Sequence, residues 1–464
     1  MPHLNLINAD RRHLIHPVVN YRTHETRGVT VLESGHGMFL RDAAGNELFD
    51  AFSGLWCVNT GYGHASIVEA AARQMAKLPY ATGYFHYGSE PAIELASLLA
   101  EKSPASLQRV YFTLGGSDAV DSAIRFITHY YNGAGRSTKK QFIALERGYH
   151  GSSTTGAGLT ALPAFHRNFD LPLATQHHIP APYLYRGAYA DDAALIAASI
   201  SGLEAKVSEL GADNVAAFFC EPVQGSGGVI VPPVGWLRAM RDACRRLDIL
   251  FVADEVITGF GRTGPLFACD AEQVEPDLMT VAKGLTAGYA PMGAVLMSER
   301  IYQAIADADP VAPVGHGQTY SAHPVSAAVG LEVMRLYHEG GLLANGVARA
   351  PQFAAGLDTL RAHPLVGDAR YRGLLGALEL VSDKTSKQRF DPALGLPDRI
   401  AAAAYTNGIV FRAFADGVLG FAPALSMTKD ECDLMFARVV KTLDDVLDQA
   451  DVRAALRRKA NADA

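Results

Sequence analysis

Short apolar runs recur through the middle of the chain, separated by polar or amphipathic stretches. Five of these runs have the length and the aromatic or β-branched content of buried strands. They are RVYFT (109–113), FIAL (142–145), AAFFC (216–220), ILFVA (249–253) and LMTVA (278–282). Because helical stretches separate the runs, the pattern is typical of βα units and predicts an α/β fold with a mostly parallel sheet.

Two of the intervening stretches predict helices with defined ends. One begins at Ser66, which has the capping-box spacing with Glu69. Its apolar face is predicted to hold Ile67, Ala71, Met75 and Leu78. The other, DAVDSAIRFITHYY, follows a Gly-Gly-Ser turn in which Ser117 is the expected N-cap, and it ends at Asn132-Gly133.

The texture of the chain changes near residue 325, where Ala- and Leu-rich helices are interrupted by the strand-like segments RYRGLLGALELV and GIVFRAFADGVLGFAP. We therefore expect a large domain over 61–324 and a small α+β domain over 325–464. The first segment, 1–60, has short strands on either side of a turn at 44–46, and we expect it to pack with the small domain.

Composition narrows the classes of function. The 464 residues are 49% hydrophobic and 19% charged, as in a globular protein with a large core, and a net charge of -7 offers no basic stripe for a nucleic acid. The N-terminal residues lack the apolar core of a signal peptide, and no run approaches the ~18 apolar residues of a membrane span. Five scattered cysteines, without C-x-x-C or zinc-type spacing, predict reduced thiols, a cytoplasmic location and no metal site.

Candidate chemistry comes from two residues that follow predicted strands. Asp254 closes ILFVA, and Lys283 follows LMTVA. Parallel strands present their carboxyl ends at the sheet edge where ligands bind, so we expect the two side chains to lie together. An uncharged lysine amine can form an imine with an aldehyde, and a carboxylate against a pyridine nitrogen keeps that ring an electron sink. The pair suggests pyridoxal 5'-phosphate (PLP), although either residue alone also fits a turn or a solvated strand end.

A phosphate site is expected where RVYFT passes through Gly115-Gly116-Ser117 into a helix. Close backbone approach, a hydroxyl and free N–H groups at the positive end of the helix dipole suit an anion. A capped βα turn without a ligand has the same residues. Gly115-x-Ser117-x-Ala119 also nearly matches the nucleophile elbow of a serine hydrolase, but it lacks the last glycine of that motif.

A second motif, GFGRTG (259–264), matches the G-x-G-x-x-G of NAD-dependent oxidoreductases. A dinucleotide site needs this motif directly between a strand and a helix. Here DEVIT intervenes after the strand and no helix start follows, so the oxidoreductase interpretation is weak.

In DEVITGFGRTG (254–264) and TVAKGL (280–285) the chain resembles the class III (subgroup II) aminotransferases of PLP fold type I. Further blocks in the family's order extend the resemblance over most of the chain. They are LFDAFSGLWCVNTGYGH, FTLGGSDAVDSA, GYHGS, EPVQGSGGV, GHGQTYSAHP and RGLLGALEL. The resemblance implies a homodimer with active sites at the subunit interface, a large PLP-binding domain and a small domain built from both chain ends.

The resemblance also implies a set of cofactor-binding residues. Lys283 is similar to the catalytic Schiff-base lysine and Asp254 to the partner of the pyridine nitrogen, while Tyr149 and Val256 would cover the two faces of the ring. Thr319 would reach the phosphate from the neighbouring subunit. The full set is Gly116, Ser117, Tyr149, His150, Glu221, Asp254, Val256, Ile257, Lys283 and Thr319.

Substrate-binding residues follow from the same resemblance. The aromatic lining of the pocket in amine and ω-amino acid:pyruvate transaminases is similar to Trp56, Tyr84, Phe85 and Tyr149. Arg412 resembles the mobile arginine that pairs with a substrate carboxylate and swings aside for an uncharged amine. A guanidinium suits this task because it stays charged and binds carboxylates in bidentate fashion. Without the resemblance, the aromatics also fit a core, and Arg412 also fits a solvated surface.

Two positions depart from the family's common pattern. Ser226 stands where 4-aminobutyrate, ornithine and acetylornithine aminotransferases carry a second glutamate, which makes such a specialist less expected. In LGGSD, Asp118 replaces the usual glutamate, which leaves the phosphate contacts open.

We therefore predict a PLP-dependent ω-transaminase that moves an amino group from an amine, a diamine or a β- or ω-amino acid to pyruvate. In this ping-pong cycle the cofactor alternates with pyridoxamine phosphate (PMP), and the products are alanine and a ketone or aldehyde. An aminomutase or a decarboxylase would also keep Lys283 and Asp254, and a non-catalytic PLP-binding protein is a further alternative. A test for amino-group transfer to added pyruvate would distinguish the transaminase from these alternatives.

Overall fold

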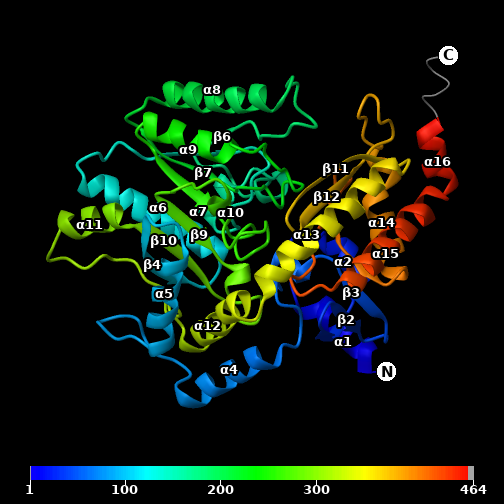
Figure 1. The fold of residues 1–464 in the computed structure, drawn as a ribbon, viewed down its shortest axis with the longest axis horizontal. Coiled ribbons are helices and arrows are strands. Elements are labelled where there is room, and N and C mark those ends of the chain that lie inside the picture. The colour runs from blue at the N-terminus through cyan, green and yellow to red at the C-terminus, as the bar shows by residue number, and fades with distance from the viewer. Residues whose placement is uncertain (1, 458–464) are drawn as a thin grey trace.

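The computed structural model describes residues 2–457 and is built around a large central sheet (Figure 1). The strands of this sheet are β4 (Leu107–Thr113), β5 (Gln141–Leu145), β6 (Gln176–Ile179), β7 (Val215–Cys220), β8 (Leu250–Asp254), β9 (Leu278–Val281) and β10 (Gly293–Ser298). Their order is β4-β10-β9-β8-β7-β5-β6. Only β10 runs antiparallel to its neighbours, β4 and β9. The predicted α/β fold with a mostly parallel sheet is confirmed.

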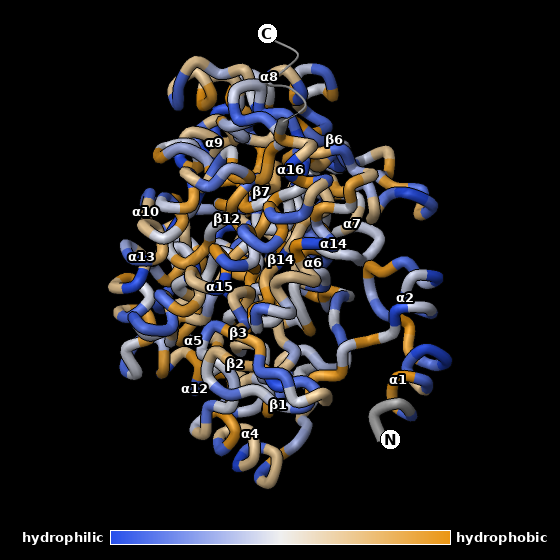
Figure 2. The backbone as a smooth tube through the Cα atoms, turned by 90° about the vertical axis from the view of Figure 1, so that its right-hand side faces the viewer, coloured by the Kyte–Doolittle hydropathy of each residue, from blue (hydrophilic) through white to orange (hydrophobic). Residues whose placement is uncertain are grey.

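Helices cover both faces of the central sheet. One face is covered by α6 (Gly116–Gly133), α7 (Thr154–Leu159) and α11 (Glu299–Ala308), and the other by α5 (Glu90–Lys102), α8 (Asp192–Leu210) and α9 (Trp236–Arg246). Phe219 and Val252 pack into the first layer, whereas Phe218 and Phe251 pack into the second. Because both faces are buried, the strands are continuous apolar runs, and the chain around β7 is hydrophobic (Figure 2).

Two smaller sheets lie beside this core. One has the order β1-β2-β3-β13 and the other β11-β12-β15-β14. Their bounds are β1 (Leu32–His36), β2 (Phe39–Asp42), β3 (Glu47–Asp50), β11 (Val366–Arg372), β12 (Leu375–Leu380), β13 (Ile409–Val410), β14 (Arg412–Ala413) and β15 (Val418–Phe421). β13 pairs with β3 in parallel, which joins the N-terminal strands to the C-terminal part of the chain. The domain boundaries near residues 60 and 324 stay a prediction.

The remaining helices lie mostly around the smaller sheets. They are α1 (Pro2–His13), α2 (Tyr21–Arg27), α3 (Ser53–Trp56), α4 (Ala65–Lys77), α10 (Ala268–Ala271), α12 (Pro324–His338), α13 (Leu342–Thr359), α14 (Leu396–Thr406), α15 (Lys429–Leu447) and α16 (Ala450–Arg457). α12 packs across α4 and α5. Within residues 2–457, none of the helices combines the length and the apolar content that crossing a bilayer requires.

Two predicted helix caps are wrong. α4 begins at Ala65 after His64, and the Ser66 hydroxyl donates to Glu332 of α12 instead of capping its own helix. α6 begins two residues earlier than predicted, so Gly115 is the N-cap and Ser117 lies inside the first turn. In both cases the serine hydroxyl forms a hydrogen bond with a residue far away in the sequence instead of capping its own helix.

The predicted apolar face of α4 is wrong in part. Ile67 is buried as predicted, but Met75 and Leu78 are exposed. Ala70 and Gln74 complete the buried face instead. Gln74 can be buried because its side-chain amide donates to the carbonyl of Leu78.

Candidate active site

The predicted site residues follow the carboxyl ends of neighbouring strands. Asp254 is the last residue of β8, and Lys283 lies two residues beyond the end of β9. Glu221 follows β7 directly, and Tyr149 and His150 follow β5 after a short turn. The strands β9, β8, β7 and β5 follow one another in the sheet and all run parallel. Their carboxyl ends therefore lie at one edge of the sheet, and all five side chains start from that edge.

Asp254 is held by two hydrogen bonds at this edge. The backbone N–H of Val256 donates to Oδ1 at 3.1 Å, and His150 Nδ1 lies 2.8 Å from Oδ2. The side chains of His150 and Asp254 are 0% and 3% exposed, so the pair is shielded from solvent. Burial disfavours an imidazolium, but the hydrogen bond and the charge of Asp254 outweigh it and raise the pKa of His150. Nε2 of His150 is buried without a hydrogen-bond partner among the described residues.

Glu221 has its carboxylate fixed on the backbone of two loops. The N–H groups of Tyr149 and Gly225 donate to its two oxygens, each at 2.9 Å. Burial raises the pKa of Glu221 to about 7, although the nearby His150 opposes the rise. Glu221 thereby positions Tyr149, whose ring packs edge-on against Phe165 at 5.3 Å.

Lys283 begins a single 3₁₀ turn, η2 (Lys283–Leu285), and has a left-handed φ of 39°. Removal from water lowers the pKa of its ammonium group, and the charges of Asp254 and Glu221 limit the shift. The uncharged amine is therefore present at lower pH than in an ordinary lysine. Lys283 therefore lies close enough to the carboxylates of Asp254 and Glu221 to interact with their charges.

The N-terminus of α6 closes the other side of this site. Gly115, the N-cap, gives no side-chain cap to the first N–H groups of the helix. A Cβ atom on Gly116 would lie 3.0 Å from Val256 Cγ1, so α6 approaches the loop after Asp254 closely. Ser117 Oγ accepts the N–H of Ser152 at 3.1 Å, which ties the helix start to the loop after β5. This helix end is a ready anion site.

Trp56 and Ile257 meet in a separate apolar cluster beside the smaller sheets. Trp56 is 3% exposed and packs on Phe52 at 4.6 Å between ring centroids. Phe414 packs against the same cluster, and the guanidinium of Arg412 lies over its ring at 5.4 Å. Trp56, Ile257 and Arg412 thus come from distant segments to one part of the fold.

The other predicted residues lie on the surface of the chain. Tyr84 and Phe85 are 39% and 81% exposed, and Tyr84 lies close to Gly317. Thr319 is exposed, and its carbonyl accepts the hydroxyl of Tyr80 at 3.0 Å. No hydrogen bond, ion pair or ring contact among the described residues joins these three to Lys283, and their roles stay a prediction.

Three residues under the lysine turn were not predicted. Arg262 is fully buried and donates to Asn59 Oδ1 at 2.6 Å, and Asn59 Nδ2 donates to the carbonyl of Phe260. The hydroxyl of Tyr337 donates to the carbonyl of Gly284 at 2.6 Å. Burial lowers the pKa of Arg262 to about 10. The motif GFGRTG (259–264) could have pointed to these residues. Its arginine and glycines form this buried packing instead of a dinucleotide site.

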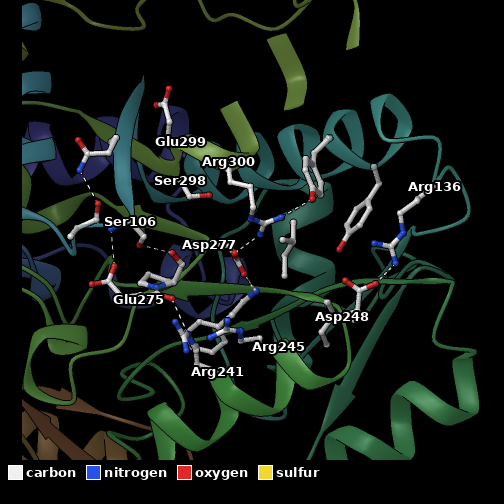
Figure 3. Close-up of a pocket in the computed structure, with 18 residues that line it drawn as sticks. Ser106, Arg136, Arg241, Arg245, Asp248, Glu275, Asp277, Ser298, Glu299 and Arg300 are labelled. Atoms are coloured by element: carbon white, nitrogen blue, oxygen red, sulfur yellow. Dashed lines mark hydrogen bonds and ion pairs between the residues drawn. The ribbon is translucent and has the colours of Figure 1, made fainter. Parts of the chain in front are cut away.

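A cavity of about 640 Å³ lies at the opposite edge of the sheet (Figure 3). It is lined by residues at the amino ends of β4, β8 and β9 and the carboxyl end of β10, among them Arg136, Asp248, Asp277 and Arg300. Arg136 pairs with Asp248, and Arg300 with Asp277. None of the described lining residues belongs to the predicted set, so this cavity is distinct from the Lys283 site.

Residues 21–443 match the family model for aminotransferase class III. The chain belongs to the class III aminotransferases. It is 39% identical to putrescine–pyruvate aminotransferase of Pseudomonas aeruginosa over 438 residues, an alignment that covers 94% of each chain. It is 36% identical over 464 residues to diaminobutyrate–2-oxoglutarate transaminase of Halomonas elongata, covering 98% of this chain and 99% of the relative. The ω-transaminase of Pseudomonas jessenii, solved in complex with PMP, superposes with a TM-score of 0.93 at 35% identity and covers 95% of this chain and 98% of that chain.

Membership of the family establishes PLP fold type I and PLP as the cofactor. The residues of this chain fit that cofactor. The uncapped start of α6 suits its phosphate, the buried Asp254–His150 pair suits a protonated ring nitrogen, and Lys283 has a lowered pKa.

Proposed function

We propose that this aminotransferase is an ω-transaminase in which Lys283 is the catalytic base. The observation that carries the proposal is the placement of Lys283 and Asp254 after neighbouring parallel strands, with removal from water lowering the pKa of the lysine. When bound, PLP supplies an aldehyde for amines and a ring that withdraws electrons from the substrate carbon. Lys283 would hold and move the proton at that carbon, because removal from water lowers its pKa and so favours the uncharged amine.

The neighbouring residues would orient the cofactor. Asp254, backed by His150, would hold the proton of the ring nitrogen, and Glu221 would fix the backbone that carries Tyr149. Tyr149 and Val256 would cover the two faces of the ring, with Ile257 beside Val256. The N–H groups at Gly116 and Ser117 would bind the phosphate.

We further propose a homodimer in which Thr319 of each chain completes the phosphate site of its partner. The support is the exposure of Thr319 together with a cluster of exposed aromatic side chains nearby. These are Tyr80, Tyr84, Phe85, Tyr87 and Tyr320. Exposed apolar patches of this kind are typical of protein interfaces.

The substrates would be an amine, a diamine or a β- or ω-amino acid as donor and pyruvate as acceptor, in a ping-pong cycle. Arg412 would bind the carboxylate of the acceptor, while Trp56, Tyr84 and Phe85 would line the side that receives the donor. The relative that acts on putrescine and pyruvate favours this pairing. The relative named for 2-oxoglutarate makes that keto acid the second candidate acceptor.

The decisive experiment follows the visible absorption of the purified holoenzyme through the two half-reactions. Alanine should change the spectrum and pyruvate should restore it, whereas glutamate followed by 2-oxoglutarate should do so far more slowly. The reverse order of rates would make 2-oxoglutarate the acceptor. A spectrum that responds to neither pair would favour an aminomutase or a decarboxylase, and Lys283→Ala should remove every response.

For the cell compartment we propose the cytoplasm. The support is that all five cysteines, Cys57, Cys220, Cys244, Cys269 and Cys432, are free thiols. Thiols stay reduced in that compartment. Fractionation of the source cells would test it, and recovery with an exported marker would contradict it.

A further inference from the structure

The first two helices form a pair that has almost no apolar core. α1 and α2 lie at the edge of the molecule, joined by residues 14–20 (Figure 2). α2 buries none of its residues. Six large apolar side chains of this segment are exposed and Ile7 is half-buried; the exposed ones are Leu6, Leu14, Ile15, Val18, Val19 and Tyr21. Among the described residues, hydrophobic burial therefore contributes little to holding α1 against α2, and short segments with a small core commonly depend on another link.

Polar groups provide the described contacts between the helices. Arg11 of α1 donates to the carbonyl of Thr26 in α2 at 3.0 Å, and three further polar side chains meet beside it. Asp10 comes from the last turns of α1, His16 from the connection and His24 from α2. His16 Nε2 lies 2.6 Å from Asp10 Oδ1, and His24 Nε2 lies 2.8 Å from Asp10 Oδ2. Their side chains are only 25%, 11% and 13% exposed for His16, Asp10 and His24. One ligand atom from each residue falls within 4.8 Å of the other two.

Hydrogen bonding accounts for only one of these two contacts. His16 and Asp10 form a hydrogen bond. His24 Nε2 and Asp10 Oδ2 lie at ion-pair distance, and both atoms are buried without a further partner among the described residues. When His24 is neutral, these two buried atoms lose their ion pair, and a bound cation would then satisfy both of them.

We propose that Asp10, His16 and His24 bind a divalent cation of the zinc type. Imidazole nitrogens and a carboxylate oxygen are its ordinary protein ligands, and three of them leave a fourth position for water. Binding would require an ionised carboxylate and neutral imidazoles, so it would replace the hydrogen bond between His16 and Asp10. Bonds of about 2.0–2.1 Å would place nitrogen and oxygen about 3.3 Å apart, which requires each imidazole to move outward by roughly 0.6 Å.

The cation would fasten α1 to α2. Its ligands come from both helices and from the connection between them, so binding would close the whole segment from residue 10 to residue 24. A site formed only in the folded segment couples the free energy of binding to ordering. This proposal is independent of the aminotransferase chemistry.

Titration of the chelator-treated, full-length holoenzyme with Zn²⁺ alone tests the site by calorimetry. One strong site per chain is expected in the wild type, and His16→Ala and His24→Ala should each weaken it by more than about 100-fold. His13→Ala is the matched control, because His13 is exposed at the end of α1 and outside the cluster. Co²⁺ should give the visible absorption of a tetrahedral site in the wild type and the control only.

The ordering effect has its own readout. Zn²⁺ should slow tryptic cleavage after Arg22 and Arg27 in the wild type and the His13 variant, but not in the two ligand variants. Equal Zn²⁺ binding by the wild type and both ligand variants would overturn the proposal, as would no strong site in the wild type. The cofactor spectrum of each variant reports independently that the fold is intact.

Discussion

Arg412 is exposed at the start of β14, with its guanidinium resting on the ring of Phe414. A long, exposed arginine can move toward a carboxylate or away from it without disturbing the core. We expect Arg412→Ala to lower kcat/KM for pyruvate about 10- to 100-fold, the worth of a charge-assisted hydrogen-bonded pair. Steady-state kinetics with an uncharged amine donor at saturating pyruvate should show a much smaller loss for the donor.

Arg412→Lys is the control for charge without bidentate geometry. It should recover part of the pyruvate activity, since an ammonium group still attracts a carboxylate. Equal losses for the keto acid and for the amine in both variants would remove the proposed role of Arg412.

Glu255 is a buried carboxylate beside the site that the proposed chemistry does not use. It accepts the hydroxyl of Thr258 at 2.5 Å and the N–H of Cys269 at 2.8 Å, yet burial raises its pKa to about 7. The folded state thus holds a proton that the unfolded state releases near pH 4.3, so stability falls as the pH rises from there through about 7. In Glu255→Gln this fall should shrink by up to roughly 3 kcal/mol.

Urea denaturation of the apoenzyme from pH 4.5 to pH 8 measures this difference. Glu299→Gln is the control of opposite sign, because the hydrogen bond from Arg109 lowers the pKa of Glu299. A paired surface glutamate stabilises the fold at higher pH. Its removal should therefore not reduce the loss of stability that the wild type shows as the pH rises. Parallel stability curves for the wild type and Glu255→Gln would show that Glu255 is ionised in the fold.

Residue positions were predictable from the sequence where a strand end fixes them. Asp254, Lys283 and Glu221 each follow an apolar run, and the parallel sheet brings such residues to one edge. Arg262 and Asn59 were not predictable as a pair, because they lie 203 positions apart and only tertiary packing joins them.

At the scale of elements, the turn η2 sets the position of the lysine. A Cβ atom on Gly284 would lie 2.7 Å from Asn59 Nδ2 and 2.8 Å from Phe260 Cβ, so only glycine fits. Gly284→Ala should lower the free energy of unfolding by about 1–3 kcal/mol through overpacking. Denaturant titration measures the loss, and the cofactor spectrum should change because the turn carries Lys283.

Gly202→Ala in α8 is the matched control. A Cβ atom there would meet nothing within 4 Å, and alanine favours a helix more than glycine does. It should leave the protein unchanged or slightly more stable. A Gly284→Ala variant as stable as this control would show that the packing beneath the lysine turn is loose.

The elements themselves were predictable where the apolar pattern is long, but their ends and direction were not. The five strand runs and α6 were predicted correctly. Ser66 and Ser117 do not cap their helices, because each forms a hydrogen bond with a residue distant in the sequence. The strand β10 was missed as well. Its run GAVLMS is as apolar as a parallel strand because both of its faces are buried, and nothing local reveals that it runs antiparallel.

At the scale of the whole molecule, the fold class followed from alternating strands and helices, but the complete site did not. Thr319, Tyr84 and Phe85 lie on the surface of the single chain. A residue supplied by a second chain leaves no trace in strand order or burial pattern. Its assignment needs an experiment on the assembly.

Complementation between two inactive variants provides that experiment. Lys283→Ala removes the base, and Thr319→Asp sets a negative charge against the phosphate, so each homodimer should be inactive. If Thr319 acts across the interface, a mixed dimer has one site with Lys283 from one chain and Thr319 from the other, both intact. Random 1:1 pairing on co-expression should then restore about a quarter of wild-type activity, since half of the dimers carry one working site. If Thr319 serves its own chain, every site in the mixture stays defective, and the absence of activity in a verified mixed dimer would contradict the shared site.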